Sequence, residues 1–247
     1  MSANKIELVH TCTGNDLYGN NHRTYCSDRS WNLTQNKCGK KSQNCCADKP
    51  NPDWQNGWWQ AAQHLPSPNF GARPLQAHID LIVLHSISLP PGKFGNGYVQ
   101  ALFTNHLDWN AHPYFKSIEG LKVSAHFFIQ RDGRIWQFVS CDDRAWHAGA
   151  SHYRGKDNCN DDSIGIELEG LEGELFEPAQ YLALQNLCPA LLQKYPIAHI
   201  AGHEHIAPGR KADPGSGFKW ALLQQTLGLN NTYFPCPAKN KSSQNPG

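Results

Sequence analysis

The six residues from Ile79 to Leu84, IDLIVL, constrain the fold of this chain more than any other stretch. Five of the six are apolar, which is typical of a β-strand buried on both faces. His85 follows directly, and open α/β sheets hold their ligand sites at the carboxyl ends of such strands. The run therefore predicts a central strand with His85 as a candidate site residue. A core histidine hydrogen-bonded to the backbone is the ordinary alternative for a single histidine here.

A second strand is predicted for SIGIELEG, from Ser163 to Gly170. Alternation puts three apolar residues on one face and Glu167, with Gly165, on the other. A carboxylate in a central strand needs a partner or a task, because its desolvation is costly. A solvent-facing side chain without a role is the alternative. Gly165 indicates that another group approaches this face closely.

The remaining pattern predicts a single α/β domain over residues 54–229, with a mixed central β-sheet flanked by helices. The first half of this domain is expected to have an extended surface segment from Trp54, a long connection over 86–122 that walls the site, and a β-hairpin around Arg131–Gly133. A loop with Trp146 and His147 lining a pocket follows. The second half is expected to have a helix over 178–195 that is kinked or broken at Pro189, a short strand before His203, and a helix that ends at Gly228. His126, among apolar neighbours, is expected to be structural.

The stretch IAGHEHIAPGRKAD, residues 200–213, contains several residues that could bind a metal ion or take part in catalysis. Nine residues separate His203 from Asp213, and Pro208 and Gly209 between them turn the backbone. Both side chains can therefore converge on one point without sharing a helix. Lys211, two residues before Asp213, would project to the same side of an extended segment. Two candidate metal ligands beside an ammonium group indicate metal-assisted attack on a carbonyl, with His85 as the leading third ligand.

Composition excludes several function classes. The net charge of +1 and the pI near 7.6 give no reason to expect nucleic acid or an anionic membrane as partner. The chain has no run of eighteen apolar residues, so no transmembrane helix is expected. Its N-terminus lacks the pattern of a secretory signal. We therefore expect a cytoplasmic protein, with a monomer as the default state.

The two ends of the chain differ from the predicted domain. Five of the nine cysteines lie in the polar residues 1–53, where no C-x-x-C pair supports a structural zinc site. We expect this extension to be poorly ordered and most cysteines to be free thiols. The polar residues 230–247 are expected to form a disordered tail.

Five blocks of sequence carry a family resemblance: HSISLPPGKFG, VSAHFFIQRDGRIWQF, RAWHAGAS, CNDDSIGIELEG and GHEHIAPGRKADPG. In this order they resemble the cytoplasmic N-acetylmuramoyl-L-alanine amidases of the AmpD type, which are zinc amidases related to bacteriophage T7 lysozyme and the peptidoglycan-recognition proteins. The resemblance runs from about Asn56 to Gly228 and implies that amidase fold. Residues 1–53 lie outside it.

The resemblance implies a role for each matching residue. His85, His203 and Asp213 match the family's ligands for one zinc ion, and Glu167 and Lys211 match its catalytic pair. His205 is a rival for His203, but the Gly-His pair and the spacing to Asp213 favour His203. Substrate contacts are implied or expected for a further group: Ser86, Lys122, Trp146, His147, Leu168, Ala207 and Arg210. Asn158 stands where the family usually has a basic residue, which puts carboxylate anchoring there in doubt.

The implied reaction is hydrolysis of the amide between the lactyl group of N-acetylmuramic acid and L-alanine. The AmpD branch prefers 1,6-anhydromuropeptides from cell-wall turnover, and in some hosts their removal limits β-lactamase induction. Three alternatives stay open: an amidase acting on polymeric murein in the periplasm or in phage lysis, a non-catalytic muropeptide-binding module, and a zinc domain built on the N-terminal cysteines.

Overall fold

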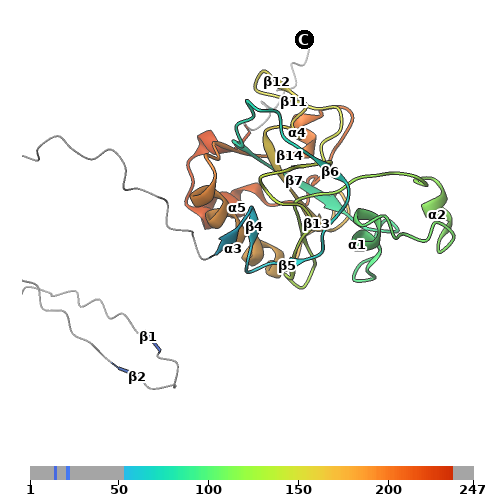
Figure 1. Ribbon diagram of the computed structural model, residues 1–247, viewed down its shortest axis with the longest axis horizontal. Coiled ribbons are helices and arrows are strands. Elements are labelled where there is room, and N and C mark those ends of the chain that lie inside the picture. The colour runs from blue at the N-terminus through green and yellow to red at the C-terminus, as the bar shows by residue number, and fades with distance from the viewer. Residues whose placement is uncertain (1–13, 16–20, 23–52, 236–247) are drawn as a thin grey trace, which may run out of the picture. The chain divides into compact units, whose positions relative to one another are not determined.

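The computed structural model describes residues 14–15, 21–22 and 53–235, and the chain divides into two compact units, Met1–Ala47 and Asp48–Gly247 (Figure 1). In the first unit, β1 (Gly14–Asn15) pairs antiparallel with β2 (Asn21–His22). The rest of the expected N-terminal extension, with its five cysteines, lies outside the described residues. The second unit contains all the other described residues.

A six-stranded mixed sheet forms the centre of this unit, as expected. Its strand order is β14-β7-β13-β8-β9-β5. The strands are β14 (His199–Gly202), β7 (Leu81–Ile87), β13 (Ser163–Glu169), β8 (Phe127–Ile129), β9 (Ile135–Gln137) and β5 (Gln63–His64). The first four are parallel to one another, β8 and β9 form the predicted antiparallel hairpin, and β5 adds a parallel edge.

Three short strand pairs lie outside the central sheet. They are β3 (Trp54–Gln55) with β4 (Trp58–Trp59), β6 (Phe70–Gly71) with β10 (Arg144–Ala145), and β11 (His152–Tyr153) with β12 (Lys156–Asp157). All three pairs are antiparallel. They are too short to have a readable sequence period.

Helices α3 (Pro178–Lys194) and α5 (Trp220–Leu227) cover one face of the sheet (Figure 1). The largest apolar cluster lies between them and the strands and includes Leu84, Ile166 and Leu168. Gly228 ends α5 in the left-handed conformation, as predicted. None of the helices in the described part of the chain has the length and apolar character needed to cross a bilayer.

Of the two effects expected of Pro189, a kink or a break in α3, the break is absent. The helix continues for five residues beyond it. Pro189 lies on the exposed side, whereas Leu187, Cys188 and Leu191 are buried against the sheet. Burial of these neighbours outweighs the hydrogen bond that a proline removes from a helix interior.

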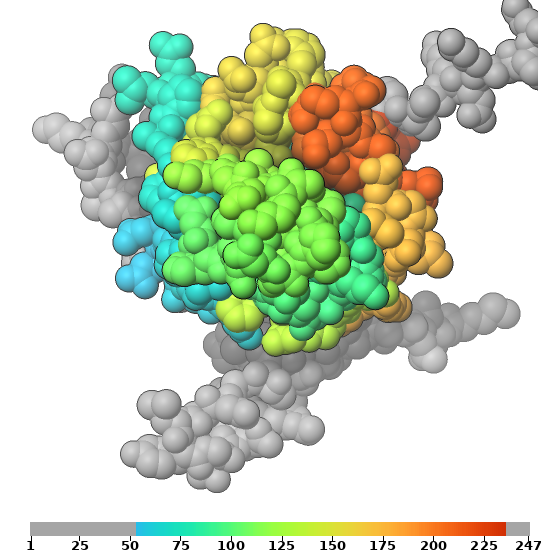
Figure 2. All heavy atoms as spheres, turned by 90° about the vertical axis from the view of Figure 1, so that its right-hand side faces the viewer, coloured from blue at the N-terminus to red at the C-terminus, as the bar shows by residue number. Residues whose placement is uncertain are grey.

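The opposite face carries a second apolar cluster built around α1 (Tyr98–Phe103) and α2 (Pro113–Lys116). Phe115 and Phe128 are fully buried in it, so the long connection over 86–122 is packed against the sheet rather than free. In the space-filling view this connection forms the green surface toward the viewer (Figure 2). The short helix α4 (His203–Ile206) follows β14 on the same unit.

Burial at the two ends of the domain goes beyond the prediction. Most of the segment after Trp54 is exposed, as expected, but Trp54 and Trp59 are 6% and 8% exposed, and Trp54 packs edge-on against Tyr195. At the other end, residues 231–233 form a 3-10 helix, η1 (Asn231–Tyr233), and Phe234 is buried beside Trp220. The domain therefore extends at least to residue 235, because large aromatic side chains at its ends are buried in the core.

His126 is fully buried and hydrogen-bonded, which agrees with a structural role. Its Nδ1 accepts the amide proton of Gly165 at 2.9 Å, so the neutral ring carries its proton on Nε2, 3.1 Å from the carbonyl oxygen of Asp143. Burial, reinforced by the charge of Arg73, lowers the pKa of His126 to about 3.

We expect His126 to destabilise the metal-free fold in acid. Between pH 6.5 and 3 the unfolded chain binds a proton that the folded ring cannot, so the free energy of unfolding falls by up to about 1.4 kcal/mol per pH unit. Urea unfolding at pH 7.5, 6.5 and 5.5 measures this. His126→Asn, which retains an acceptor but does not titrate, should show a shallower pH slope. The exposed His112→Asn is the control, and equal slopes in all three proteins would contradict the expectation.

Candidate metal centre and active site

His85 and Glu167 lie side by side on one face of the central sheet. His85 is in β7 and Glu167 in β13, and the two are register partners in this parallel pair. Their face is opposite to α3, because Leu84, Ile166 and Leu168 point into the core beneath that helix. His85 was expected directly after its strand, but β7 continues two residues beyond it. The pairing with β13 extends to Ile87 and accounts for the difference.

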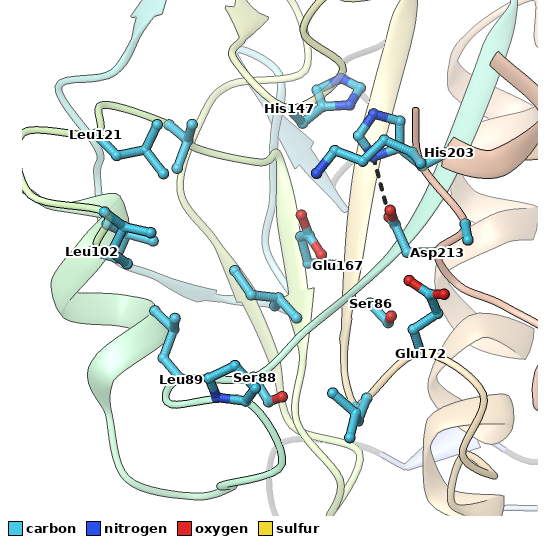
Figure 3. Close-up of a pocket in the computed structure, with 18 of the residues that line it drawn as sticks. Ser86, Ser88, Leu89, Leu102, Leu121, His147, Glu167, Glu172, His203 and Asp213 are labelled. Atoms are coloured by element: carbon cyan, nitrogen blue, oxygen red, sulfur yellow. Dashed lines mark hydrogen bonds and ion pairs between the residues drawn. The ribbon is translucent and has the colours of Figure 1, made fainter. Parts of the chain in front are cut away.

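His203 and Asp213 reach the same point from the other side. His203 is the first residue of α4, immediately after β14, which pairs with β7. The chain then returns, and the amide of Glu204 donates to the carbonyl oxygen of Asp213 at 2.8 Å. His85 Nδ1 and His203 Nδ1 are 2.9 Å apart, and they lie 3.2 and 3.1 Å from Asp213 Oδ2. The predicted ligand set is therefore assembled, and Figure 3 shows its His203–Asp213 pair.

The geometry of these three atoms fits a metal ion. Ligand atoms at the corners of a zinc tetrahedron are about 3.3 Å apart, given ligand distances of about 2.0–2.1 Å. The observed separations of 2.9, 3.2 and 3.1 Å match one face of such a tetrahedron, and His203 and Asp213 also line the adjoining cavity. Among the described residues, these three form the group of His, Cys, Asp and Glu side chains able to hold an ion.

The electrostatics also favour the metal-binding forms of the ligands. Burial lowers the pKa of His85 to about 4, so its imidazole is neutral at physiological pH. Burial opposes ionisation of Asp213, but the hydrogen bonds with His203 and His85 outweigh it and hold its pKa below the usual range. A metal ion binds neutral imidazole and ionised carboxylate. His85 and Asp213 are thus in the protonation states that a metal ion requires.

Glu167 is a buried carboxyl group with an unsatisfied oxygen. It is 9% exposed, and its Oε2 has no hydrogen-bond partner. Burial raises the pKa of Glu167 well above its usual value, the charge of Asp213 raises it further, and Lys211 opposes both effects. An unpaired carboxylate oxygen in a buried site requires a ligand or a water molecule to satisfy it. Glu167 therefore has the environment of an acid–base group.

Glu167, His203 and Asp213 line a cavity of about 750 Å³. One side is polar, with His203, Asp213 and Glu167, and the apolar side chains of Leu89, Leu102 and Leu121 lie on the other (Figure 3). The prediction that the 86–122 connection walls the site agrees with this arrangement. Its individual apolar residues, and Glu172 after β13, have no sequence signal that distinguishes them from ordinary core or surface positions.

The predicted substrate contacts divide into two groups. Four line the cavity together with Lys211: Ser86, Trp146, His147 and Arg210. Lys122, Leu168 and Ala207 do not line it, and the last two are buried in packed clusters. Leu168 lies on the face opposite to Glu167, so the alternation of the strand turns it away from the site.

His205, the rival of His203, has a separate role. Its Nδ1 accepts the amide proton of Gly202 at 2.9 Å, and its ring packs against Trp220. It lies outside the ligand group, which supports His203 as the ligand.

Chemically, such a site suits a metal-dependent hydrolase that attacks a carbonyl group. The chain belongs to the N-acetylmuramoyl-L-alanine amidase family, whose model matches residues 75–216. It is 51% identical over 170 residues to the 1,6-anhydro-N-acetylmuramyl-L-alanine amidase AmpD of Citrobacter freundii, covering 68% of this chain and 91% of that protein. It is 49% identical over 180 residues to AmpD of Escherichia coli K12, covering 72% and 98%.

A solved structure extends the similarity to the fold. A crystal structure of a selenomethionine AmpD derivative has a TM-score of 0.68 and 50% sequence identity, and the match covers 70% of this chain and 98% of that one. The expected amidase fold and enzyme class are thereby confirmed.

Proposed function

We propose that this enzyme is a zinc-dependent amidase that cleaves 1,6-anhydro-N-acetylmuramyl-L-alanine bonds in muropeptides released during cell-wall recycling. The substrate class follows the names of the relatives that match most of the domain at about half identity. The observation that carries the proposal is the unpartnered oxygen of Glu167 in the same cavity as His203 and Asp213, which form a candidate metal site with His85. An acid–base group beside a metal site with an open corner is what amide hydrolysis requires.

Zinc is the ion that we assign to His85, His203 and Asp213. Two histidines and one carboxylate form a common ligand set of catalytic zinc sites. When bound, zinc supplies Lewis acidity and lowers the pKa of a coordinated water to about 7. His85 is buried on the central sheet and His203 at the start of α4, so packing holds both rings in the positions that they already have.

Glu167 moves the proton in this scheme. Its free Oε2 accepts a proton from the attacking water, and the buried carboxyl then holds it, because its pKa is raised. The same oxygen delivers the proton to the amine of L-alanine as the carbon–nitrogen bond breaks. The proton that Glu167 takes from the water is the one that it gives to the leaving amine, so Glu167 ends the reaction in the state in which it began.

Lys211 faces the same cavity and stabilises the negative oxygen that develops on the attacked carbonyl. We expect Lys211→Ala to lower kcat about 100- to 1,000-fold, the usual effect of losing one donor to such an oxygen, with zinc binding unchanged. Steady-state kinetics and metal content measure the two effects. Lys219→Ala, at an exposed lysine immediately before α5, is the matched control. A Lys211→Ala variant with kcat near that of the control would rule out this role.

Arg210 holds a fixed position at the edge of the cavity. Its Nη2 donates to the carbonyl oxygens of Ala148 and Ala150 at 2.8 and 2.6 Å. We assign it to a carboxylate of the stem peptide, which a guanidinium group binds well. Ser86 and Trp146 are the other contacts that we propose from the cavity lining.

We also propose that the enzyme acts as a monomer in the cytoplasm. The described cysteines, Cys141, Cys159 and Cys188, are buried free thiols, a state that a reducing compartment maintains. Cell fractionation and light scattering test the two statements separately.

Metal analysis of the purified full chain tests the proposed cofactor. We expect one zinc per chain, complete loss of zinc in His85→Ala, and recovery of activity in the stripped wild type with zinc but not with magnesium. Stoichiometric zinc remaining in His85→Ala would move the metal to another site, including the N-terminal cysteines.

A further inference from the structure

The dipeptide His147–Ala148 lies directly behind the two histidine ligands. The AWHAG segment predicts His147 as a pocket residue, and His147 does line the cavity. It is nevertheless only 8% exposed, and its nearest polar contact is a ligand rather than solvent: His147 Nδ1 is 2.9 Å from His85 Nε2. If His85 uses Nδ1 toward the metal, its Nε2 carries the proton and donates it to His147.

Ala148 performs the matching function for the other histidine. Its carbonyl oxygen is 3.0 Å from His203 Nε2. A carbonyl oxygen accepts only, so this contact favours the tautomer with the proton of His203 on Nε2 and the lone pair of Nδ1 free for the metal. Arg210 Nη2 also lies 3.4 Å from His203 Nε2, but it is closer to the carbonyl oxygens of Ala148 and Ala150, to which it donates. One dipeptide thereby selects the same tautomer in both ligands.

Asn160 anchors this dipeptide. Its side-chain Oδ1 accepts both backbone amide protons, from His147 at 3.0 Å and from Ala148 at 2.8 Å. Asn160 is 6% exposed, and its own carbonyl oxygen accepts from Arg73 Nη1 at 3.1 Å. The side-chain oxygen of Asn160 thus holds the backbone of His147 and Ala148 in a fixed position relative to the sheet.

The ring of His147 is confined on its remaining sides. A Cβ atom added to Gly165 would lie 2.4 Å from His147 Cγ, which explains the glycine in β13 next to Glu167. His147 Nε2 lies 3.3 Å from Ser163 Oγ, and that hydroxyl donates to the carbonyl oxygen of Cys159. With Nε2 protonated and donating to Ser163, His147 Nδ1 is the acceptor that His85 needs.

We propose that His147 and Ala148, held by Asn160, are positioning residues that fix the tautomer and orientation of both histidine ligands. This inference rests on the proposed zinc site. Groups behind a ligand that accept its second ring proton keep the coordinating nitrogen in place, and their loss typically weakens metal binding about 10- to 100-fold. Asn160 does not touch the cavity, so its effect on the metal acts through the dipeptide.

The test measures zinc affinity of the full chain by competition with a chromophoric chelator. Asn160→Leu removes the shared acceptor, and His147→Phe keeps a ring over Gly165 but no acceptor for His85. We expect both to bind zinc about 10- to 100-fold more weakly. Asn160→Asp and His147→Asn retain an oxygen near the lost acceptor and should recover most of the affinity.

Two reference variants separate positioning from general stability. Gln180→Leu removes another buried amide, which donates to the carbonyl oxygens of Ile129 and Glu169 on the α3 side of the sheet. It should lower the unfolding midpoint of metal-free and zinc-loaded protein equally and leave zinc affinity unchanged. His85→Ala removes a ligand and should abolish tight binding.

The outcomes are distinct. Affinities of Asn160→Leu and His147→Phe within about twofold of the wild type, with weak binding in His85→Ala, would overturn the positioning role and leave the zinc site intact. Wild-type affinity in His85→Ala would overturn the proposed site itself. If Asn160→Leu does not fold, the His147→Phe and His147→Asn pair decides the question.

Discussion

Replacement of Glu167 by glutamine is expected to lower kcat about 100- to 10,000-fold, the usual contribution of a general acid–base group, while the zinc content stays at one per chain. Glutamine has the shape of glutamate but cannot take a proton from water and return it to an amine. The effect should be on kcat, because Glu167 takes part in bond cleavage and its Oε2 has no structural hydrogen bond to lose.

Cleavage rates and metal analysis on the same preparation measure this separation. Glu119→Gln, an exposed glutamate between α2 and β8, is the matched control and should retain wild-type kcat. Turnover in Glu167→Gln within tenfold of the control would refute the assigned role.

Replacement of Asp213 by alanine is expected to have the larger effect, because it removes both the metal and the activity. Asp213 Oδ2 lies within 3.2 Å of both histidine ligands. Its loss removes the negative ligand and leaves two neutral imidazoles. Zinc affinity should fall by more than the 10- to 100-fold that follows loss of an outer-shell partner.

Chelator competition and activity at saturating zinc measure the two effects of Asp213→Ala. Comparison with Glu167→Gln is informative, since one variant should lose metal and activity and the other activity alone. Asp157→Ala, an exposed aspartate on β12 that pairs with His152, is the control. Stoichiometric, tightly bound zinc in Asp213→Ala would contradict the proposed ligand set.

The core of this fold could be predicted because its signals are local. The apolar run before His85 and the alternation around Glu167 predict two strands, and both lie at the centre of the sheet. What the sequence could not supply is their register, which places His85 beside Glu167. Pairing between strands about eighty residues apart depends on the whole sheet. Burial of Trp54 and Phe234 has the same non-local origin.

The site shows a similar division. The spacing of His203 and Asp213 and the family resemblance predicted the ligand set that the structure assembles. The apolar wall of Leu89 and Leu102 could not be predicted, because these residues come from a connection without a clear period. The position of His147 behind His85 depends on contacts with Gly165 and Asn160. Those contacts join separate segments that only the folded chain brings together.

The most direct test of the account is a cleavage assay with a purified 1,6-anhydromuropeptide. The zinc-loaded full chain is incubated with it, with and without a chelator, and free peptide is followed by mass spectrometry. We predict release of the peptide with L-alanine at its N-terminus, loss of that release with the chelator, and recovery when zinc is restored. Cleavage that persists after the zinc has been removed, or no cleavage by protein shown to contain zinc, would contradict the account.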